Sequence, residues 1–272
     1  MKKLLTIVAL FGVITGINAQ DAAEKKILAG LTLGAGMNFN NPETVVIDSK
    51  VGSDFVVGMA FDWHFTNSIA LSTGLEFDFN RFRHQFLVPT YFDYADKEII
   101  QRGSEDEINT PPAANLDTFH LDERRYRNIY LSIPVMLRFQ TNYMGYLRYF
   151  GKFGIRNSFL LTSRVDNFGN DFNDPSVTEL EDFENAGDLS FYKGSIGLSL
   201  GAEWNFTGST CLVGELGYYY GFSEIHQQDA IGSDSDRKKS LYNDPTVAKV
   251  NREYFTPSAK QGQLLFKISF LF

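Results

Sequence analysis

The sequence has little cysteine, little histidine and no long apolar run. It contains one Cys and four His in 272 residues. A single thiol cannot form an internal disulfide, which excludes the cross-linked frameworks of small secreted domains. The longest apolar run, Leu4–Ile17, is 14 residues. A helix that crosses a bilayer needs about 20, so the sequence predicts no transmembrane helix.

Positive charge is also scarce, with 25 Lys and Arg against 33 Asp and Glu and a net charge of −8. Because nucleic acids are bound by clustered cations, this balance argues against a nucleic-acid partner. No Pro- or Ser-rich linker divides the chain. The sequence therefore favours one large domain.

The first residues have the pattern of a secretory signal peptide. Met1-Lys2-Lys3 is followed by the apolar run and then by Ala19-Gln20. A positive start, a short apolar core and a small residue at the cleavage site are typical of export signals. We expect cleavage after Ala19, which gives a signal peptide at residues 1–19 and a mature domain at residues 20–272.

What the mature sequence does contain is a regular alternation of apolar and polar residues. Phe55, Val57, Met59 and Phe61, for example, share one face, and Asp54, Gly58, Asp62 and His64 stand on the other. A period of two is the period of a β-strand. Eight segments show it: residues 27–39, 54–65, 69–80, 129–139, 145–161, 192–206, 211–223 and 261–272.

The connections between these segments alternate in length. Short links lie near residues 65–68, 140–145 and 207–209, and long polar links near residues 40–52, 86–125, 162–188 and 224–259. This alternation is typical of bacterial barrels with short periplasmic turns and long extracellular loops. The sequence thus predicts an all-β fold, a closed antiparallel eight-stranded transmembrane β-barrel.

The two faces of the strands support a membrane location. One face carries bulky apolar side chains, and the other carries Gly, Ser and charges, the inverse of a small soluble barrel. Strand edges in lipid leave backbone groups unpaired, so the barrel must close. Aromatic residues gather at both strand ends, as membrane interfaces require: Trp63, Phe65, Trp204, Phe206, Phe270 and Phe272 at the short turns, and Phe39, Phe55, Phe79, Tyr220 and Phe222 at the long loops. We therefore expect the protein to lie in the cell outer membrane.

Nine charged residues fall on the polar face and should point inward: Glu76, Arg138, Arg148, Lys152, Arg156, Lys193, Glu203, Glu215 and Lys267. An eight-stranded barrel has room for side chains but hardly for water, so buried charges there must pair. We predict pairs of Glu215 with Lys267 and of Glu203 with Arg148 and Lys152. The expected result is a plug of ion pairs, and the alternative is a narrow, gated pore.

The sequence predicts no enzyme and no cofactor. His64 should face inward, His120 and His226 should lie in loops, and His84 follows the third strand. Nothing in their spacing brings a His, a Ser and a carboxylate together. Residues 166–174 are rich in oxygen ligands but lack the spacing of a calcium loop. We therefore predict no metal site there and a solvated loop, with calcium binding in residues 166–188 as the open alternative.

The long loops are the expected interaction sites. The loop at residues 86–125 holds Pro111-Pro112 and the rings of Tyr91, Phe92, Tyr94 and Phe119. These rings could dock a partner or pack together as a cap over the barrel. The expected partners are outer-membrane lipid, lipopolysaccharide and envelope proteins that bind loops 86–125 and 224–259.

Four segments resemble one known family. Tyr130–Leu137, Tyr146–Gly151, Gly201–Phe206 and Phe266–Phe272 are similar to the PorT-like outer membrane protein beta-barrel family, often labelled porins. The resemblance covers nearly the whole mature chain and implies the barrel fold, without a catalytic signature and without implying a channel. Because the family includes a component of the type IX secretion system, it also implies an alternative function as an accessory of an envelope secretion machine.

Overall fold

The computed structural model describes residues 27–42, 46–95, 98–100, 117–185, 188–206, 210–226, 240–247, 252–255 and 257–272. The regular elements of this part of the chain are β-strands. No helix within these ranges is long and apolar enough to cross a membrane. The predicted signal peptide at residues 1–19 lies outside the described residues.

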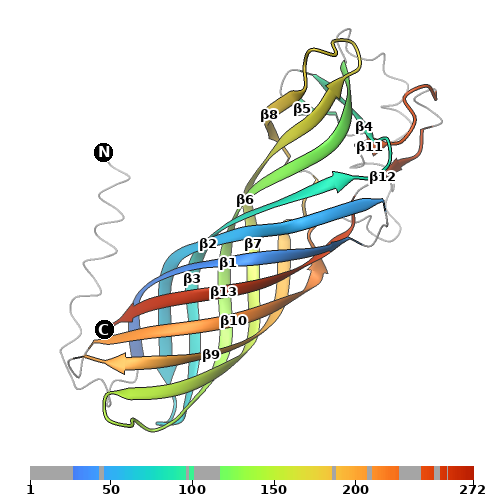
Figure 1. Ribbon diagram of the computed structural model, residues 1–272. Coiled ribbons are helices and arrows are strands. Elements are labelled where there is room, and N and C mark those ends of the chain that lie inside the picture. Colours follow the sequence, from blue (N-terminus) through green and yellow to red (C-terminus); the bar gives the residue numbers. More distant parts are fainter. Residues whose placement is uncertain are drawn as a thin grey trace.

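Eight long strands form the body of the molecule: β1 (Ile27–Pro42), β2 (Ile47–His64), β3 (Ile69–Phe86), β6 (Asp117–Gln140), β7 (Leu147–Asp171), β9 (Tyr192–Asn205), β10 (Cys211–Glu224) and β13 (Ala259–Leu271). Each is antiparallel to the next long strand, β7 pairs with β9, and β13 pairs with β1. The strands curve into an all-β barrel (Figure 1).

The alternation in the sequence decides which side of each strand faces inward. On β3, for example, Glu76 and Asp78 are buried while Leu75, Phe77 and Phe79 are exposed. Successive side chains of a strand point to opposite faces of the sheet. The polar parity of the sequence therefore fills the interior, and the apolar parity covers the outside.

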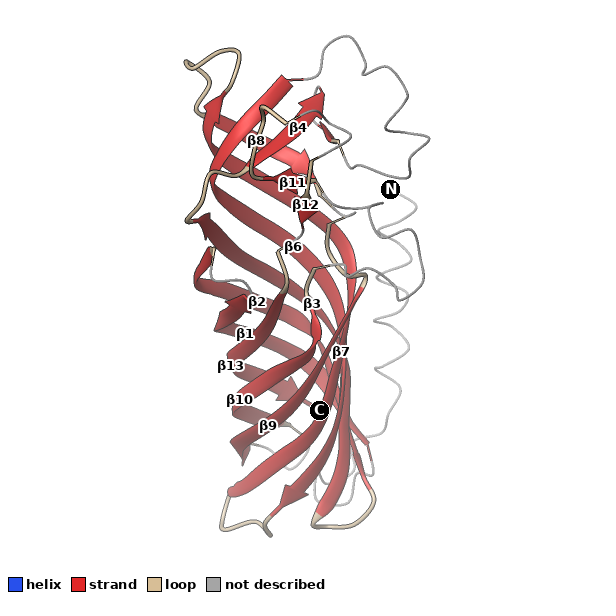
Figure 2. Cartoon of the chain, turned by 90° about the vertical axis from the view of Figure 1, so that its right-hand side faces the viewer, coloured by secondary structure: helices blue, strands red, loops and turns tan. Residues whose placement is uncertain are grey.

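Five short strands extend the sheet beyond the long-loop end of the barrel: β4 (Tyr91–Ala95), β5 (Glu98–Ile99), β8 (Glu179–Glu184), β11 (Leu241–Tyr242) and β12 (Tyr254–Phe255). β4 pairs with β6, β8 pairs with β7, and β5 joins β4 to β8. β11 lies between β4 and β12. We call this part, with the ends of β6 and β7 that carry it, the extension (Figures 1 and 2).

The extension corrects the prediction of long polar loops. Residues 117–125 belong to β6 and residues 162–171 to β7, and β8, β11 and β12 lie in segments predicted as loop. Apolar and polar residues alternate only weakly in these segments, because charged residues occupy exposed strand positions, as at Arg125 and Arg164. The predicted long link at residues 40–52 is also wrong. β2 already begins at Ile47, because residues 47–50 pair with the end of β3.

An apolar core lies where the extension meets the barrel. Phe92 and Phe119 are fully buried, with ring centroids 5.6 Å apart. They pack in one cluster with Val165, Phe183 and Leu241, among others. Of the two roles expected for the rings of residues 86–125, the structure shows self-packing for these two.

Candidate functional site

The nine charged residues predicted to face the interior all lie on the long strands. Glu76 is on β3 and Arg138 on β6; Arg148, Lys152 and Arg156 are on β7; Lys193 and Glu203 are on β9; Glu215 is on β10 and Lys267 on β13. Eight of them are buried, and the side chain of Lys152 is 10% exposed. We call these residues, with the polar groups that they contact, the interior network.

At the short-turn end, the interior network centres on Arg138. Its guanidinium donates to Asp62 of β2 and, at 2.5 Å, to Glu203 of β9. Glu203 also accepts hydrogen bonds from Arg148 at 2.8 Å and from the hydroxyl of Tyr143 at 2.6 Å. Two buried guanidinium groups and two buried carboxylates thus neutralise each other, and buried charges have to be paired in this way.

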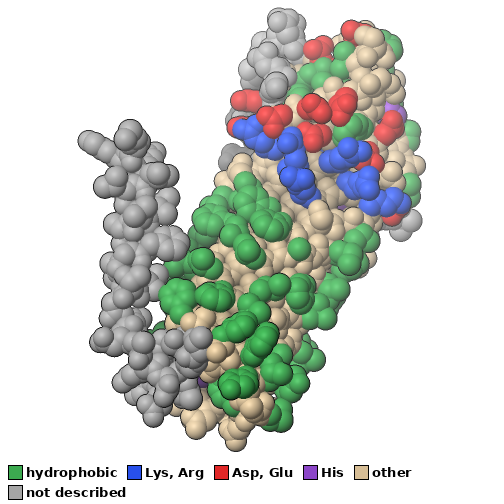
Figure 3. All heavy atoms as spheres, turned by 60° about the vertical axis from the view of Figure 1, so that its left-hand side comes forward, with side chains coloured by type: hydrophobic (Ala, Val, Ile, Leu, Met, Phe, Trp, Pro, Cys, Tyr) green, Lys and Arg blue, Asp and Glu red, His purple; other side chains and the backbone are tan. Residues whose placement is uncertain are grey.

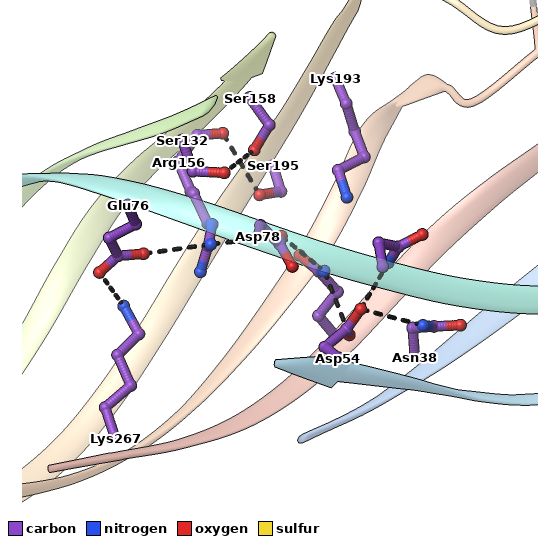
Figure 4. A network of polar contacts seen from close by, with 12 residues as sticks. Asn38, Asp54, Glu76, Asp78, Ser132, Arg156, Ser158, Lys193, Ser195 and Lys267 are labelled. Carbon is purple, nitrogen blue, oxygen red and sulfur yellow. Dashed lines mark hydrogen bonds and ion pairs between the residues drawn. The ribbon is translucent and has the colours of Figure 1, made fainter. Parts of the chain in front are cut away.

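Further along the barrel, lysines and arginines reach carboxylates on strands that are not their neighbours. Lys152 lies 2.7 Å from Glu215. Lys267 lies 2.7 Å from Glu76, which also faces Arg156 at 3.1 Å (Figure 4). Arg156 is 3.3 Å from a second carboxylate, Asp78. Each of these ion pairs crosses part of the interior.

Nearer the extension, amide side chains also belong to the interior network. The carboxylate of Asp54 accepts a hydrogen bond from Asn38 at 3.0 Å (Figure 4). It accepts another from Gln263 at 3.2 Å. Lys193 donates to Gln261 at 2.9 Å, and its ammonium lies 4.4 Å from the ring centre of Tyr130. The interior network therefore runs from the short turns up to the apolar core.

Two of the three predicted ion pairs are wrong. Glu215 and Lys267 lie opposite each other in register, but the ammonium of Lys267 binds Glu76 and Glu215 binds Lys152. Lys152 is consequently not the partner of Glu203, which pairs with Arg148. In a narrow interior, long side chains extend across the space to other strands, so strand adjacency does not identify the partner.

The sequence interpretation also missed three acidic residues of the interior network. Asp54, Asp62 and Asp78 are all buried. They stand on the polar parity of predicted strands, and the alternation marks them as inward. The same signal that selected the other nine therefore contained these three.

Among the residues that the structure describes, no histidine ring contacts both a Ser and a carboxylate. His64 lies 3.2 Å from Arg148, and His120 lies 3.6 Å from Asp122. His226 is buried rather than in a solvated loop, and its Nε2 lies 3.2 Å from Nε2 of His84. Burial, together with the nearby guanidinium of Arg124, lowers the pKa of His226 to about 3. His226 is therefore neutral in the folded protein at ordinary pH.

The oxygen-rich segment at residues 166–174 is not the solvated loop that the sequence predicts. Its first part belongs to β7, and Asp166 lies 2.7 Å from Arg127. Asp171 accepts a hydrogen bond from the hydroxyl of Tyr94 at 2.7 Å. In the part of the chain that the structure describes, no three His, Cys, Asp or Glu residues are placed to hold a metal ion.

The sequence comparison decides the family. Residues 18–227 match the family described as the outer membrane protein beta-barrel domain. The chain belongs to this family. It is an outer-membrane protein, and its barrel spans the membrane with strands. No curated protein matches the sequence.

Solved structures with a similar fold are other outer-membrane proteins. Ail from Yersinia pestis is 12% identical over 91% of this chain and 100% of that chain, with a TM-score of 0.34. OprG from Pseudomonas aeruginosa is 11% identical over 90% and 92%, with a TM-score of 0.35. The protease OmpT from Escherichia coli is 10% identical over 94% and 98%, with a TM-score of 0.35. At these identities and scores the similarities carry no argument about function.

The outer surface of this outer-membrane protein carries exposed apolar side chains over the barrel, and Figure 3 shows them in green on the face that it draws. At the short-turn end the exposed rings include Trp63 and Trp204, and at the long-loop end Phe55, Phe79 and Tyr220. Aromatic rings of this kind mark the two interfaces of a membrane. The apolar parity is therefore the lipid face.

Proposed function

We propose that the eight long strands form a closed barrel that anchors the extension outside the cell, and that the protein acts through interactions of the extension rather than by conduction. The short turns lie in the periplasm, and the long connections lie at the cell surface. The interior network plugs the barrel. The pairing of β7 with β9 and of β13 with β1 supports closure.

The observation that carries the proposal is that interior contacts join strands that are not neighbours. Arg138 links β6 to Asp62 on β2 and to Glu203 on β9. Lys267 on β13 reaches Glu76 on β3, although β1 and β2 lie between these strands in the sheet. Side chains that meet across the barrel fill the space that a water column would need.

The extension has its own polar contacts, which favour a folded platform over a set of independent loops. Asp93 of β4 accepts hydrogen bonds from Tyr242 at 2.6 Å and from Thr118 at 2.9 Å. Its other carboxylate oxygen lies 3.3 Å from Arg252. Three segments far apart in the sequence thus meet at one carboxylate. A surface that is already folded suits binding, because its side chains and loops lose little conformational freedom when a partner binds.

Planar-bilayer recording tests whether the barrel conducts ions. The wild-type protein is expected to show no steady conductance. The triple variant Glu76→Ala/Lys267→Ala/Arg156→Ala empties the middle of the interior network and is expected to leak ions, provided that its barrel remains folded. A large, steady conductance of the wild-type protein would exclude the plug and favour the narrow pore.

The orientation is tested with engineered thiols, since the only native one, Cys211, is buried. Asn173→Cys places an exposed thiol in the extension, and Met144→Cys places one at the short-turn end. A membrane-impermeant maleimide applied to intact cells is expected to label position 173 and to label position 144 only after permeabilisation. The reverse pattern contradicts the orientation.

The PorT-like resemblance of Tyr130–Leu137 and Tyr146–Gly151 favours a second candidate function, an accessory component of an envelope secretion machine. Cross-linking in intact cells, followed by identification of the partners, separates the candidates. Recovery of envelope transport proteins bound through the extension supports the accessory role. Recovery of other cell-surface molecules without transport proteins supports independent binding at the cell surface.

A further inference from the structure

A row of arginines crosses the outer face of the barrel at the point where its apolar surface ends. Arg81 of β3 lies opposite Arg127 of β6, and Arg127 lies opposite Arg164 of β7. Two residues further along these strands, toward the extension, Arg83 lies opposite Arg125. All five side chains are exposed, and we call them the outer arginine cluster. Figure 3 shows a band of Lys and Arg directly beside the apolar region, with Asp and Glu beyond it.

The stability of the sheet does not explain this row. Directly opposite residues of antiparallel strands have Cβ atoms about 5 Å apart, and like charges there are destabilising. The preceding outward positions, Phe79 and Ile129, continue the apolar face at the same register. The outer face therefore changes from apolar to cationic within one pair of residues on neighbouring strands.

Among the described residues, the acidic partners of the cluster lie on the side of the extension. The ion pairs are Arg125 with Glu123 at 2.6 Å, Arg127 with Asp166 at 2.7 Å and with Asp182 at 3.2 Å, Arg83 with Glu123 at 3.8 Å, and Arg164 with Asp182. Among the residues that the structure describes, Arg81 has no ion pair. Arg81 belongs to the row next to the apolar face, which leaves an excess of positive charge on the membrane side.

A depression of about 500 Å³ lies beside Arg81. It forms where β2 has a bulge, because Lys50 pairs with Arg83 and Ser53 with Arg81, so that two residues of β2 face one residue of β3. One of these two residues is Gly52, which adds no side chain to the depression. The lining includes four of the five arginines of the cluster: Arg81, Arg83, Arg125 and Arg127.

We propose that the outer arginine cluster binds the phosphate groups of lipopolysaccharide while the acyl chains lie against the apolar face below. Guanidinium groups bind phosphate oxygens in pairs of parallel hydrogen bonds, more specifically than a point charge does. Phe55 and Phe79, with ring centroids 6.1 Å apart, lie directly below the depression and offer the acyl chains an exposed apolar surface. A ligand with both a phosphate and acyl chains matches this surface better than a free anion.

The proposal rests on the proposed orientation, because lipopolysaccharide occupies the outer leaflet. Its test uses the full-length protein purified in detergent, where orientation plays no part. Native mass spectrometry measures the retention of bisphosphorylated lipid A by the wild-type protein and by Arg81→Gln/Arg127→Gln. Since each cation near an anionic lipid surface strengthens binding by about fivefold, the double variant should bind at least about tenfold more weakly.

Two further variants serve as controls. Arg81→Lys/Arg127→Lys keeps the charge and should recover part of the affinity. Lys260→Gln removes a cation from the long-loop end of β13, which is separated from β3 by β1 and β2, and should bind like wild type. Heat-modifiable migration in electrophoresis confirms that every variant is folded.

Three results would overturn the proposal. The first is equal retention of lipid A by the wild-type protein and the Gln double variant. The second is equal binding of dephosphorylated lipid A, which would show that only the apolar face binds. The third is full displacement of lipid A by millimolar inorganic phosphate, which would show a free-anion site. If lipid A binding fails while the thiol labelling succeeds, the proposed function stands and only this inference falls.

Discussion

Arg138 and Glu203 are 65 residues apart in the chain and meet inside the barrel, with 2.5 Å between guanidinium nitrogen and carboxylate oxygen. Both side chains are fully buried. They stand on β6 and β9, which are separated by β7 in the sheet. The contact therefore fixes the distance between two parts of the barrel wall that share no backbone hydrogen bonds.

Neutralising Glu203 should destabilise the protein. In Glu203→Gln, Arg138 and Arg148 lose a shared carboxylate, and breaking a buried ion pair by removing one partner costs about 3–5 kcal/mol. The free energy of unfolding in lipid vesicles, measured with urea, should fall by about 3 kcal/mol. Glu179→Gln, an exposed site on β8, is the control. Equal unfolding midpoints for the two variants would contradict the central role of Glu203.

A double-mutant cycle should distinguish the two possible partners of Glu215. The structure pairs Glu215 with Lys152 at 2.7 Å, whereas the sequence predicts Lys267. Residues in direct contact couple by about 0.5–3 kcal/mol. The cycle of Lys152→Met with Glu215→Gln should therefore show a larger coupling energy than the cycle of Lys267→Met with Glu215→Gln. A larger value for Lys267 would show that the interior pairs differently.

The extension should lose stability below about pH 6.5. Burial lowers the pKa of His226 from 6.5 to about 3 in the folded protein. Between these values the unfolded chain binds a proton that the folded chain does not, so stability is complete above pH 6.5 and falls by up to about 1.4 kcal/mol per pH unit as the pH drops. Hydrogen exchange at the amide of Ser190, which donates to the carbonyl of Ile225 beside His226, measures this loss. His226→Gln should remove the contribution of this residue, and an unchanged slope would contradict its role.

The cost of a charged side chain on the outer face should depend on its depth in the membrane. Leu198 on β9 and Leu87 beyond β3 are similarly exposed, at 64% and 65%. Leu198 lies within the apolar band, where an arginine costs about 2–4 kcal/mol in a transmembrane barrel. Leu198→Arg should therefore lower the free energy of unfolding in vesicles by this amount, and Leu87→Arg should leave it nearly unchanged. Similar losses at both sites would place the membrane boundary elsewhere.

The secondary structure of the barrel body was predictable because strand alternation is a local property. Whether Phe77 faces out and Glu76 faces in depends only on their parity, which the sequence displays directly. The same parity predicts nine charged residues in the interior, and the buried Asp54, Asp62 and Asp78 stand on it as well. The ends of the strands were harder to predict, because charged residues such as Arg83 and Arg125 still lie within long strands.

The sequence by itself determined which residues face lipid and which face the interior, because the side-chain period of a strand is fixed by backbone geometry. Only the tertiary structure decided how the interior charges pair, because long side chains reach across the barrel and Lys267 meets Glu76 from a distant segment. The extension likewise depends on contacts such as Asp93 with Tyr242, 149 residues apart. No local pattern encodes a meeting between such distant segments.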